Sequence, residues 1–554
     1  MAAANDGDTR AFDVIVVGAG FGGLAALHKF RDELGYSTVV FEAAAGAGGV
    51  WWWNRYPGAR CDVESLQYCY AFSDELLQDW NWTERFATQP EILSYVDHVV
   101  ERFDMAKDIR FSTRATSAIF DEKTARWTLT TDKGDVCEAR YVIMASGPLS
   151  TPNVPPFPGR EDFGGEVYHT GQWPHHAVSF EGKRVAVIGT GSSGVQAAPV
   201  IAETAAQLYV MQRTPGHSVP ARNRVHYPGE QEGVKARYKE LRKIWNSTPG
   251  ATAWRSLPTD EVALTGDKSV FSVDEQERHE IFERAWKNGG TAMHRSFNDI
   301  LVDAKASTLV NAFLHAKIDE IVKDKKVAEL VKPRQFYGTK RLILDSGYYE
   351  MFNRPNVTLV DVKSDPIETL TATGIRTKSG ATYEVDMIVF ATGYDALTGS
   401  LTRMDIRGRD GASLADVWKD GPQSYLGMMV AGFPNLFIVS GPQSPSVLAN
   451  VIVANEQQVN WIGAAIRHLD ATGVETIEAT AEAQEAWVAH VNEVGAASIY
   501  TKGDSWYVGA NIDGKPRVFM PYIGFPRYVA KCDDVVAKGY EGFALTPKRA
   551  EAAE

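Results

Sequence analysis

The stretch that decides the fold is "FDVIVVGAGFGGLAALHKF", residues 12–30. Its apolar strand pattern runs into a G-x-G-x-x-G loop at Gly18, Gly20 and Gly23, and a helix pattern follows. The next strand pattern, "STVVFE", ends in Glu42. An acidic residue at that place accepts hydrogen bonds from ribose hydroxyls in dinucleotide-binding folds. The sequence therefore predicts a dinucleotide-binding unit near the N-terminus.

A second stretch, "KRVAVIGTGSSGVQAAPVI", repeats the pattern with Gly189, Gly191 and Gly194. The strand pattern that follows it, "AQLYVMQRT", ends in Arg213 and Thr214. Glycine turns between ordinary strands and helices would explain one such loop. They do not readily explain two loops with the same spacing and the same flanking patterns.

The two units differ in the charge of the residue at the end of their second strand pattern. Glu42 lies 24 residues after Gly18, and Arg213 lies 24 residues after Gly189. A carboxylate at this position repels a 2′-phosphate, whereas an arginine binds it. We therefore predict FAD in the first unit and NADPH in the second.

Composition excludes several other classes of protein. The 554 residues are 44% hydrophobic and 11% aromatic, as in a well-cored globular protein, and the net charge of −13 argues against nucleic acid as the partner. The start, "MAAANDGDTRAFD", lacks the pattern of a secretory signal, and the most apolar run, 14–27, is too short for a membrane span. The cysteines form no disulfide or metal-binding spacing; they are Cys61, Cys69, Cys137 and Cys532. We expect a soluble cytoplasmic protein with no metal and no membrane partner.

Two further strand patterns end in small residues and glycine, "YVIMASG" (141–147) and "DMIVFATGYD" (386–395). They flank the second unit and predict two crossings between domains. The expected fold class is α/β, with two Rossmann-like dinucleotide-binding domains, for FAD and NADPH, and a helical insertion. The predicted parts are an FAD domain at 1–147 and 391–554, an NADPH domain at 148–222 and 333–390, and the insertion at 223–332.

The insertion has helical spacing. "SVDEQERHEIFERAW" opens with a capping-box pattern, Ser272 to Glu275, and "STLVNAFLHAKIDEIV" is amphipathic. We expect helices in both stretches.

Between the two glycine loops lies "FGGEVYHTGQWP", which has neither a helix nor a strand period. It contains F-x-G-x-x-x-H-x-x-x-W-P, formed by Phe163, Gly165, His169, Trp173 and Pro174. This pattern resembles the fingerprint of Baeyer–Villiger monooxygenases. The stretches at 48–65, 338–357 and 505–524 also resemble that family, and the likeness covers nearly the whole chain.

The resemblance implies an FAD-containing enzyme that consumes NADPH and O2. Such enzymes insert oxygen next to a ketone carbonyl through a C4a-peroxyflavin and a Criegee-type adduct, and the product is an ester or lactone. The implied partners are a small ketone and O2, with sulfoxidation as a side activity and a monomer or weak oligomer as the assembly. The alternatives are a flavin N- or S-monooxygenase of the same fold, a flavin disulfide reductase and a non-catalytic flavin-binding protein. Relatives that oxidise nitrogen or sulfur usually end the fingerprint in Tyr or Phe, so Trp173 and Arg341 favour ketone oxidation.

Anionic intermediates need a permanent positive charge, and arginine keeps its proton at working pH. Arg341 matches the family's catalytic arginine, and Asp62 matches its carboxylate partner. Lys340 stands beside Arg341, so it can face the 2′-phosphate with Arg213 while Arg341 faces the flavin. In isolation, Lys340 and Arg341 would instead be a solvated basic pair, and Asp62 a turn acceptor.

The remaining expected site residues follow from the same likeness. Trp506 matches a tryptophan on a mobile loop over bound NADP, and Trp52 departs from the tyrosine common in the family, as "PRY" at 526–528 departs from a glycine-rich continuation. His169 is expected to orient the joint between the domains rather than to transfer a proton. The FAD set is Gly18, Gly20, Gly23, Glu42, Gly49, Val50, Trp51, Asp62 and Tyr68. The NADP set is Gly189, Thr190, Gly191, Ser192, Ser193, Gly194, Gln196, Arg213, Thr214, Lys340, Arg341 and Trp506. The candidates that shape substrate choice are Ser446, Val447 and Leu448.

Overall fold

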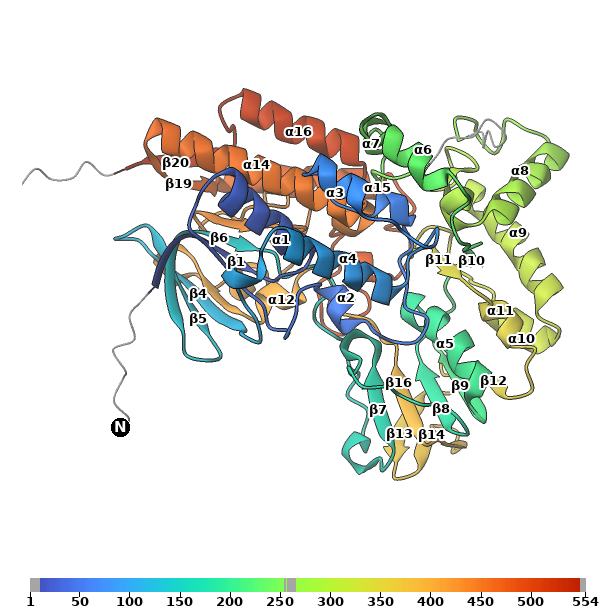
Figure 1. Cartoon of the computed structure of the whole chain (residues 1–554). Coiled ribbons are helices and arrows are strands. Elements are labelled where there is room, and N and C mark those ends of the chain that lie inside the picture. The colour runs from blue at the N-terminus through green and yellow to red at the C-terminus, as the bar shows by residue number, and fades with distance from the viewer. Residues whose placement is uncertain (1–9, 254–255, 257–265, 549–554) are drawn as a thin grey trace, which may run out of the picture.

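The computed structural model describes residues 10–253, 256 and 266–548. Figure 1 shows one large sheet around β1 and β6, a second sheet around β8 and β16, and a group of helices, α8 to α10, to the side of both. The two sheets are the frames of the two nucleotide units, and the helices belong to the insertion.

The first sheet has eight strands in the order β17-β4-β5-β6-β1-β2-β3, with β18 paired to β6. Strand β1 runs parallel to β6 and β2, whereas β4, β5 and β6 are antiparallel neighbours. The apolar end of β1 is buried on both faces, since Val14 and Val16 join one core cluster while Ile15 and Val17 join another. The strands are β1 (Arg10–Val17), β2 (Thr38–Phe41), β3 (Ile109–Arg110), β4 (Ala115–Asp121), β5 (Arg126–Thr131), β6 (Val136–Met144), β17 (Asp405–Arg407) and β18 (Leu436–Ile438).

The second sheet is entirely parallel, in the order β12-β9-β8-β16-β7. Its central strand also alternates between two cores: Val185 and Val187 face one, and Ala186 and Ile188 face the other. The strands are β7 (Glu166–His169), β8 (Arg184–Ile188), β9 (Gln207–Gln212), β12 (Val357–Asp361) and β16 (Met387–Phe390). A small antiparallel sheet of β13 (Ile367–Thr371), β14 (Gly374–Thr377) and β15 (Thr382–Glu384) precedes β16.

Each glycine loop leads into a helix, as expected. Helix α1 (Phe21–Leu27) continues as a π-helical segment, η1 (His28–Glu33), and packs against the long helix α14 (Val451–Thr472). Helix α5 (Ser192–Thr204) follows β8 in the same way. The other helices of the first domain and the C-terminal region are α2 (Val50–Trp53), α3 (Asp74–Asp79), α4 (Gln89–Arg102), α12 (Gly399–Thr402), α13 (Leu414–Val417), α15 (Ala481–Ala496) and α16 (Phe525–Ala537). A two-stranded antiparallel sheet of β19 (Val474–Ala479) and β20 (Phe543–Pro547) lies beside α14 in Figure 1.

The insertion is helical. Its helices are α6 (Glu230–Ala236), α7 (Tyr238–Asn246), α8 (Glu275–Asn288), α9 (Ala304–Ile321) and α10 (Lys325–Val331). The expected capping box was wrong, because the cap of α8 is Asp274, whose side chain accepts a hydrogen bond from the backbone of Glu277. Ser272 instead donates to the carbonyl of Ser269 and lies outside the helix.

The chain enters the second sheet after β6 and leaves it through β16, and both predicted strands are present. The fingerprint was wrongly read as having no strand, because β7 forms within it and pairs with β16 as an edge strand. The domain boundaries at 147–148, 222–223, 332–333 and 390–391 stay a prediction, and the sheet membership of the strands supports them. Two short parallel strands, β10 (Ser218–Pro220) and β11 (Ile343–Asp345), join the ends of the insertion.

All four cysteines are buried and unpaired. Across residues 10–253, 256 and 266–548, no helix is both long and apolar enough to cross a membrane.

Candidate active site

The first glycine loop is shaped for close contact. A Cβ added to Gly23 would lie 1.7 Å from the carbonyl oxygen of Gly18, so a side chain there would prevent α1 from approaching the loop. Gly49 covers the loop from the other side, where its Cβ would lie 3.0 Å from Gly20. The backbone thus forms a tight cradle that fits a pyrophosphate, with Val50 starting the helix that follows Gly49.

Glu42 is buried directly after β2. Its two carboxylate oxygens accept hydrogen bonds from the backbone N–H of Ala19 (2.6 Å) and Ala44 (2.7 Å). Burial raises the pKa of Glu42, and these two backbone donors oppose that rise. The side chain is therefore fixed at the mouth of the loop, where an acceptor for ribose hydroxyls is expected.

The second loop repeats the close approach but not the closing charge. A Cβ on Gly194 would lie 2.1 Å from the carbonyl oxygen of Gly189. Gly191 is exposed with open space around it, and Ser192 and Ser193 form the first turn of α5. Thr190 donates to the carbonyl of Thr214, 3.3 Å away.

Two basic side chains meet beside this loop. Arg213 is exposed at the end of β9, and Lys340 approaches it from the return of the insertion. Burial lowers the pKa of Lys340, and the charge of Arg213 lowers it further, while Asp504 opposes the shift. Among the described residues, neither side chain forms an ion pair with a carboxylate. These two positive charges without an ion-pair partner in the described part of the chain fit a 2′-phosphate.

Arg341 and Asp62 form a two-pronged ion pair. The Nε of Arg341 lies 2.5 Å from Oδ2 of Asp62, and its Nη2 lies 2.7 Å from Oδ1. Burial would raise the pKa of Asp62, but the guanidinium outweighs it and lowers that pKa. Burial would likewise lower the pKa of Arg341, and the carboxylate raises it instead. Both groups therefore stay ionised, and the fork geometry fixes the plane of the guanidinium.

The same arginine reaches the expected substrate loop. Its Nη1 donates to the carbonyl of Val447, 2.8 Å away, on the short helix η9 (Ser446–Leu448). Ser446 is fully buried and donates to the carbonyl of Ser440, so it does not face the site. Val447 and Leu448 are partly exposed beside Arg341 and remain the candidates of this loop that can contact a substrate.

The aromatic run after Gly49 divides into different roles. The indole N–H of Trp51 donates to the hydroxyl of Tyr68 over 3.1 Å, which joins the two residues expected near the flavin. Trp52 points elsewhere: its ring lies over Gly46, where a Cβ would come within 2.1 Å, and against the ring of His175. The departure at Trp52 thus affects the outer packing of this segment.

The segment carrying Trp506 rests on the site. Trp506 begins the short helix η10 (Trp506–Val508), and its ring lies 4.4 Å from that of Tyr507. Tyr507 is fully buried; burial raises its pKa, and the charge of Arg341 opposes that rise. Further along, Lys515 pairs with Asp395 at 2.7 Å. Tyr507 was missed in the sequence, where an aromatic next to Trp506 carried no separate signal.

The fingerprint joins the two units rather than entering the site. His169 ends β7; its Nδ1 accepts from the N–H of Gly171 (2.9 Å), and its Nε2 lies 3.3 Å from the hydroxyl of Thr392. Burial lowers the pKa of His169, so the ring is neutral and orients this turn. The backbone N–H of Trp173 donates to the carbonyl of Trp53. Phe163 and Trp173 are buried in the cores on the two sides of the second sheet, and Gly165 leaves room for the carbonyl of Asp386.

Gln196 links the two domains from α5. Its side chain accepts from the hydroxyl of Tyr56 (2.8 Å) and donates to the carbonyl of Arg60 (3.1 Å). Burial raises the pKa of Tyr56 to about 12, so this hydroxyl stays protonated and donates. Tyr56 was also missed, although it lies in the "RYPGARCD" stretch that leads to Asp62.

Comparison with known proteins identifies the family. The profile of flavin-binding monooxygenase-like proteins matches residues 11–248. The chain is 43% identical to phenazine N-monooxygenase PhzNO1 of Lysobacter antibioticus, over 98% of both chains, and 41% identical to a Baeyer–Villiger monooxygenase of Pseudooceanicola batsensis, over 96% of this chain and 95% of the relative. A solved structure of oxidised steroid monooxygenase bound to NADP superposes with a TM-score of 0.90 at 48% identity, covering 97% of this chain and all of that one. The chain belongs to the Baeyer–Villiger monooxygenase family. It is therefore an FAD-containing, NADPH-dependent enzyme of the α/β fold predicted from the sequence.

For this Baeyer–Villiger monooxygenase, the two glycine cradles fit the cofactors that the family uses. The first cradle, with Glu42, suits FAD, and the second, with Arg213 and Lys340, suits NADPH. The individual site residues stay predictions.

Proposed function

We propose that the enzyme oxidises a ketone to an ester or lactone, with Arg341 and Asp62 as its charged centre. The overall reaction consumes ketone, O2, NADPH and one proton, and it releases ester, NADP and water. When bound, FAD is reduced by NADPH, and the reduced flavin supplies the activation of O2. The observation that carries the proposal is the Asp62–Arg341 pair, tied to the carbonyl of Val447 in the expected substrate loop.

Arg341 would stabilise the negative charge that develops on oxygen during insertion. A guanidinium cannot lose its proton at working pH, and a charge held by two hydrogen bonds from Asp62 needs no reorganisation when the substrate reacts. Three of its five N–H groups are used by Asp62 and Val447, which leaves donors for the substrate region. Asp62 acts through Arg341, so it is a positioning residue.

The cofactor roles follow from the two loops. Glu42 would hold the ribose of FAD, while Arg213, Thr214 and Lys340 would hold the 2′-phosphate of NADPH. Trp506 and Tyr507 would close over the nicotinamide side, because they rest beside Arg341.

The four buried thiols support a reducing, cytoplasmic location. The proposed partners are a small ketone and O2, and the proposed assembly is a monomer or weak oligomer.

Nitrogen oxidation is the second candidate. The 43% identity to a protein named phenazine N-monooxygenase favours it, and the arrangement of cofactor loops would be the same for both reactions. One assay separates them: NADPH consumption is measured with linear, aryl, small-ring and steroid ketones and with a phenazine, and products and hydrogen peroxide are quantified. Ester or lactone formed in proportion to NADPH supports the proposal. Peroxide alone with every ketone, together with N-oxide from the phenazine, would replace it with the second candidate.

A further inference from the structure

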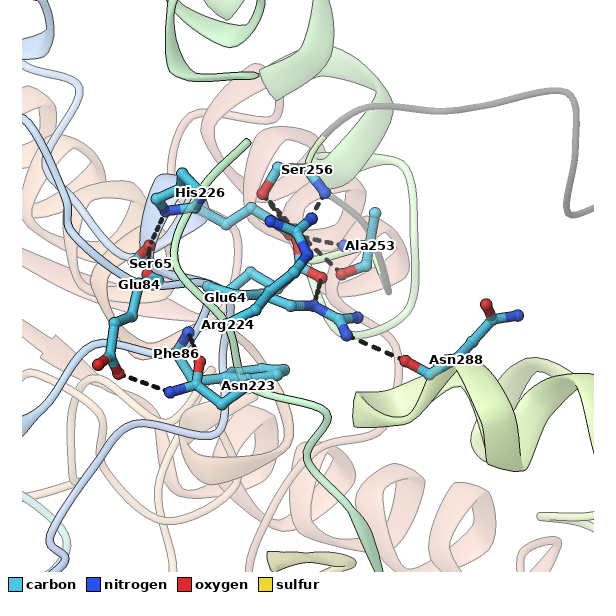
Figure 2. A network of polar contacts seen from close by, with 12 residues as sticks. Glu64, Ser65, Glu84, Phe86, Asn223, Arg224, His226, Ala253, Ser256 and Asn288 are labelled. Carbon is cyan, nitrogen blue, oxygen red and sulfur yellow. Dashed lines mark hydrogen bonds and ion pairs between the residues drawn. The ribbon is translucent and has the colours of Figure 1, made fainter. Parts of the chain in front are cut away.

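A polar network connects the segment that carries Asp62 to the insertion. Its core is a buried ion pair between Glu64 and Arg85, whose side chains are 6% and 8% exposed and whose Oε1 and Nε lie 2.7 Å apart. Figure 2 shows this network, in which Glu64 and Glu84 of the N-terminal part face residues of the insertion such as Ser256 and Asn223. Burying two charges is costly unless their remaining polar atoms are satisfied, so each further partner of Glu64 contributes to its position.

The second oxygen of Glu64 holds Ser256 of the insertion. The backbone N–H and the hydroxyl of Ser256 both donate to Oε2 of Glu64, at 2.6 and 2.8 Å. Arg85 in turn donates to the carbonyl of Asn288 at the end of α8 (3.0 Å), as drawn in Figure 2. One ion pair therefore fixes two separate places of the insertion.

Gln67 adds the central connection. This residue ends η2 (Ser65–Gln67), and its side chain is 1% exposed. Its Oε1 accepts from the hydroxyl of Thr252 (2.6 Å) and from the N–H of Ala253 (2.7 Å), and its Nε2 donates to the carbonyl of Ala253 (3.1 Å). The amide therefore binds both the donors and an acceptor of this short segment: the hydroxyl of Thr252 and the N–H of Ala253 through Oε1, and the carbonyl of Ala253 through Nε2.

The backbone of Gln67 is held by the substrate loop. The side-chain amide of Asn450 donates to the carbonyl of Gln67 over 2.7 Å, and the N–H of Asn450 donates to the carbonyl of Gly250 (2.8 Å). Asn450 lies two residues after the helix η9 that contains Val447 and caps the N-terminus of α14. Three segments therefore meet here: 62–67, 250–253 together with Ser256, and 446–450. Two of them also contact Arg341, through Asp62 and Val447.

We propose that Gln67, supported by Glu64, is a positioning residue that sets insertion segment 250–253 as a third wall of the ketone site and so determines which ketones react. The inference rests on the proposed ketone oxidation. Removing the amide would leave the N–H of Ala253 without its partner and the hydroxyl of Thr252 with only the carbonyl of Ala253 (3.3 Å), in a partly buried place, and we expect this to shift the segment relative to Arg341. The two glycine loops, at 18–23 and 189–194, lie on other segments and would be unaffected.

The test compares two ketones of different size, cyclopentanone and racemic 2-phenylcyclohexanone, in the FAD-loaded full chain. Gln67→Met keeps the side-chain length and removes the three hydrogen bonds of the amide group to Thr252 and Ala253, together with its two longer ones, 3.4 Å each, to Glu64 and Ser256. We expect kcat/KM for the larger ketone to change about tenfold relative to the smaller one, mostly through KM, and the enantiomer ratio of its lactone to change about threefold. Flavin reduction by NADPH and the FAD content should stay the same. Thr252→Val, which removes one hydroxyl from the other side of the contact, should shift both ratios in the same direction by about threefold.

Gln78→Met is the matched control. Gln78 is an exposed glutamine that also donates to the insertion, at the carbonyl of Lys235, but it lies in α3 and away from Asp62. In Gln78→Met the kcat/KM ratio of the two ketones and the enantiomer ratio of the lactone should remain those of the wild type. Unchanged ratios in Gln67→Met and Thr252→Val would overturn the inference, as would equal losses on both ketones together with slower flavin reduction. If Gln67→Met does not fold, Thr252→Val decides alone. A wild type that forms no ester from any ketone would refute the proposed function instead.

Discussion

The loop at Gly18–Gly23 and the loop at Gly189–Gly194 share one backbone design and differ in their surroundings. In both, the third glycine admits the carbonyl of the first, and a charged residue follows the next strand. Glu42 is buried and fixed by two backbone donors of its own domain. Arg213 is exposed, and its partner Lys340 comes from a segment more than 120 residues later.

This difference matches two kinds of cofactor. A buried acceptor fixed by neighbouring backbone forms a site for a resident group, because the site is complete within one domain. A site assembled from two exposed or half-buried cations can open and release its ligand, as a coenzyme consumed in each turnover requires. The glycine pattern therefore sets the phosphate turn, while the surroundings of Glu42 and Arg213 favour FAD in the first unit and NADPH in the second.

Removing the buried charge of Glu42 should have the largest effect, and the effect should be on FAD binding. In Glu42→Gln the ribose hydroxyls lose an ionised acceptor, and a charge-assisted hydrogen bond contributes about 1.5–3 kcal/mol. We expect FAD to bind about 10- to 100-fold more weakly, measured by flavin released on dialysis. Glu203→Gln, an exposed carboxylate at the end of α5, should leave FAD content unchanged. Full FAD retention in Glu42→Gln would show that this residue does not hold the ribose.

Removing the exposed charge of Arg213 should weaken only the binding of NADPH. Arg213→Ala should raise the KM for NADPH about 30-fold, because one charge-assisted contact to the 2′-phosphate is lost. NADH lacks that phosphate and serves as the internal control, with a change below about twofold. Both constants come from rates of flavin reduction. Equal changes for NADPH and NADH would contradict the assignment of Arg213.

The smallest effect concerns the pH dependence of Lys340. Since burial and Arg213 lower the pKa of Lys340, its charge is lost at a lower pH than in an ordinary lysine. The KM for NADPH should therefore rise about fivefold as the solution becomes alkaline, whereas in Lys340→Arg it should stay flat over the same range. Steady-state rates across that range measure both enzymes. A parallel rise in the variant would place the titrating group elsewhere.

The sequence predicted the parts of the fold that depend on local pattern. The strand-loop-helix units around Gly18 and Gly189 carry their own spacing, and each closing charge follows its strand at a fixed distance. Strand β7 was missed because its apolar signal is weak and its pairing with β16 joins residues more than 200 positions apart. The cap of α8 was assigned to Ser272 because the capping-box pattern fits it, whereas Asp274 makes the actual contact.

Site residues that depend on contacts between distant segments were likewise not predictable from local pattern. Arg341 and Asp62 were predicted by resemblance alone, since no spacing links residues 279 positions apart. Gln67 and Tyr507 carried no signal in the sequence. Their importance arises from burial and from partners on distant segments, such as Thr252 and Arg341, which only the folded chain brings together.

We propose that the role of Arg341, held by Asp62, is in oxygen insertion rather than in flavin reduction. It is tested most directly in Arg341→Ala by measuring flavin reduction, ester and hydrogen peroxide in the same preparation. We predict that NADPH still reduces the flavin, within about threefold of the wild-type rate, that peroxide accounts for the NADPH consumed, and that no ester forms. Ester formed by this variant at the wild-type yield per NADPH would contradict this role of Arg341.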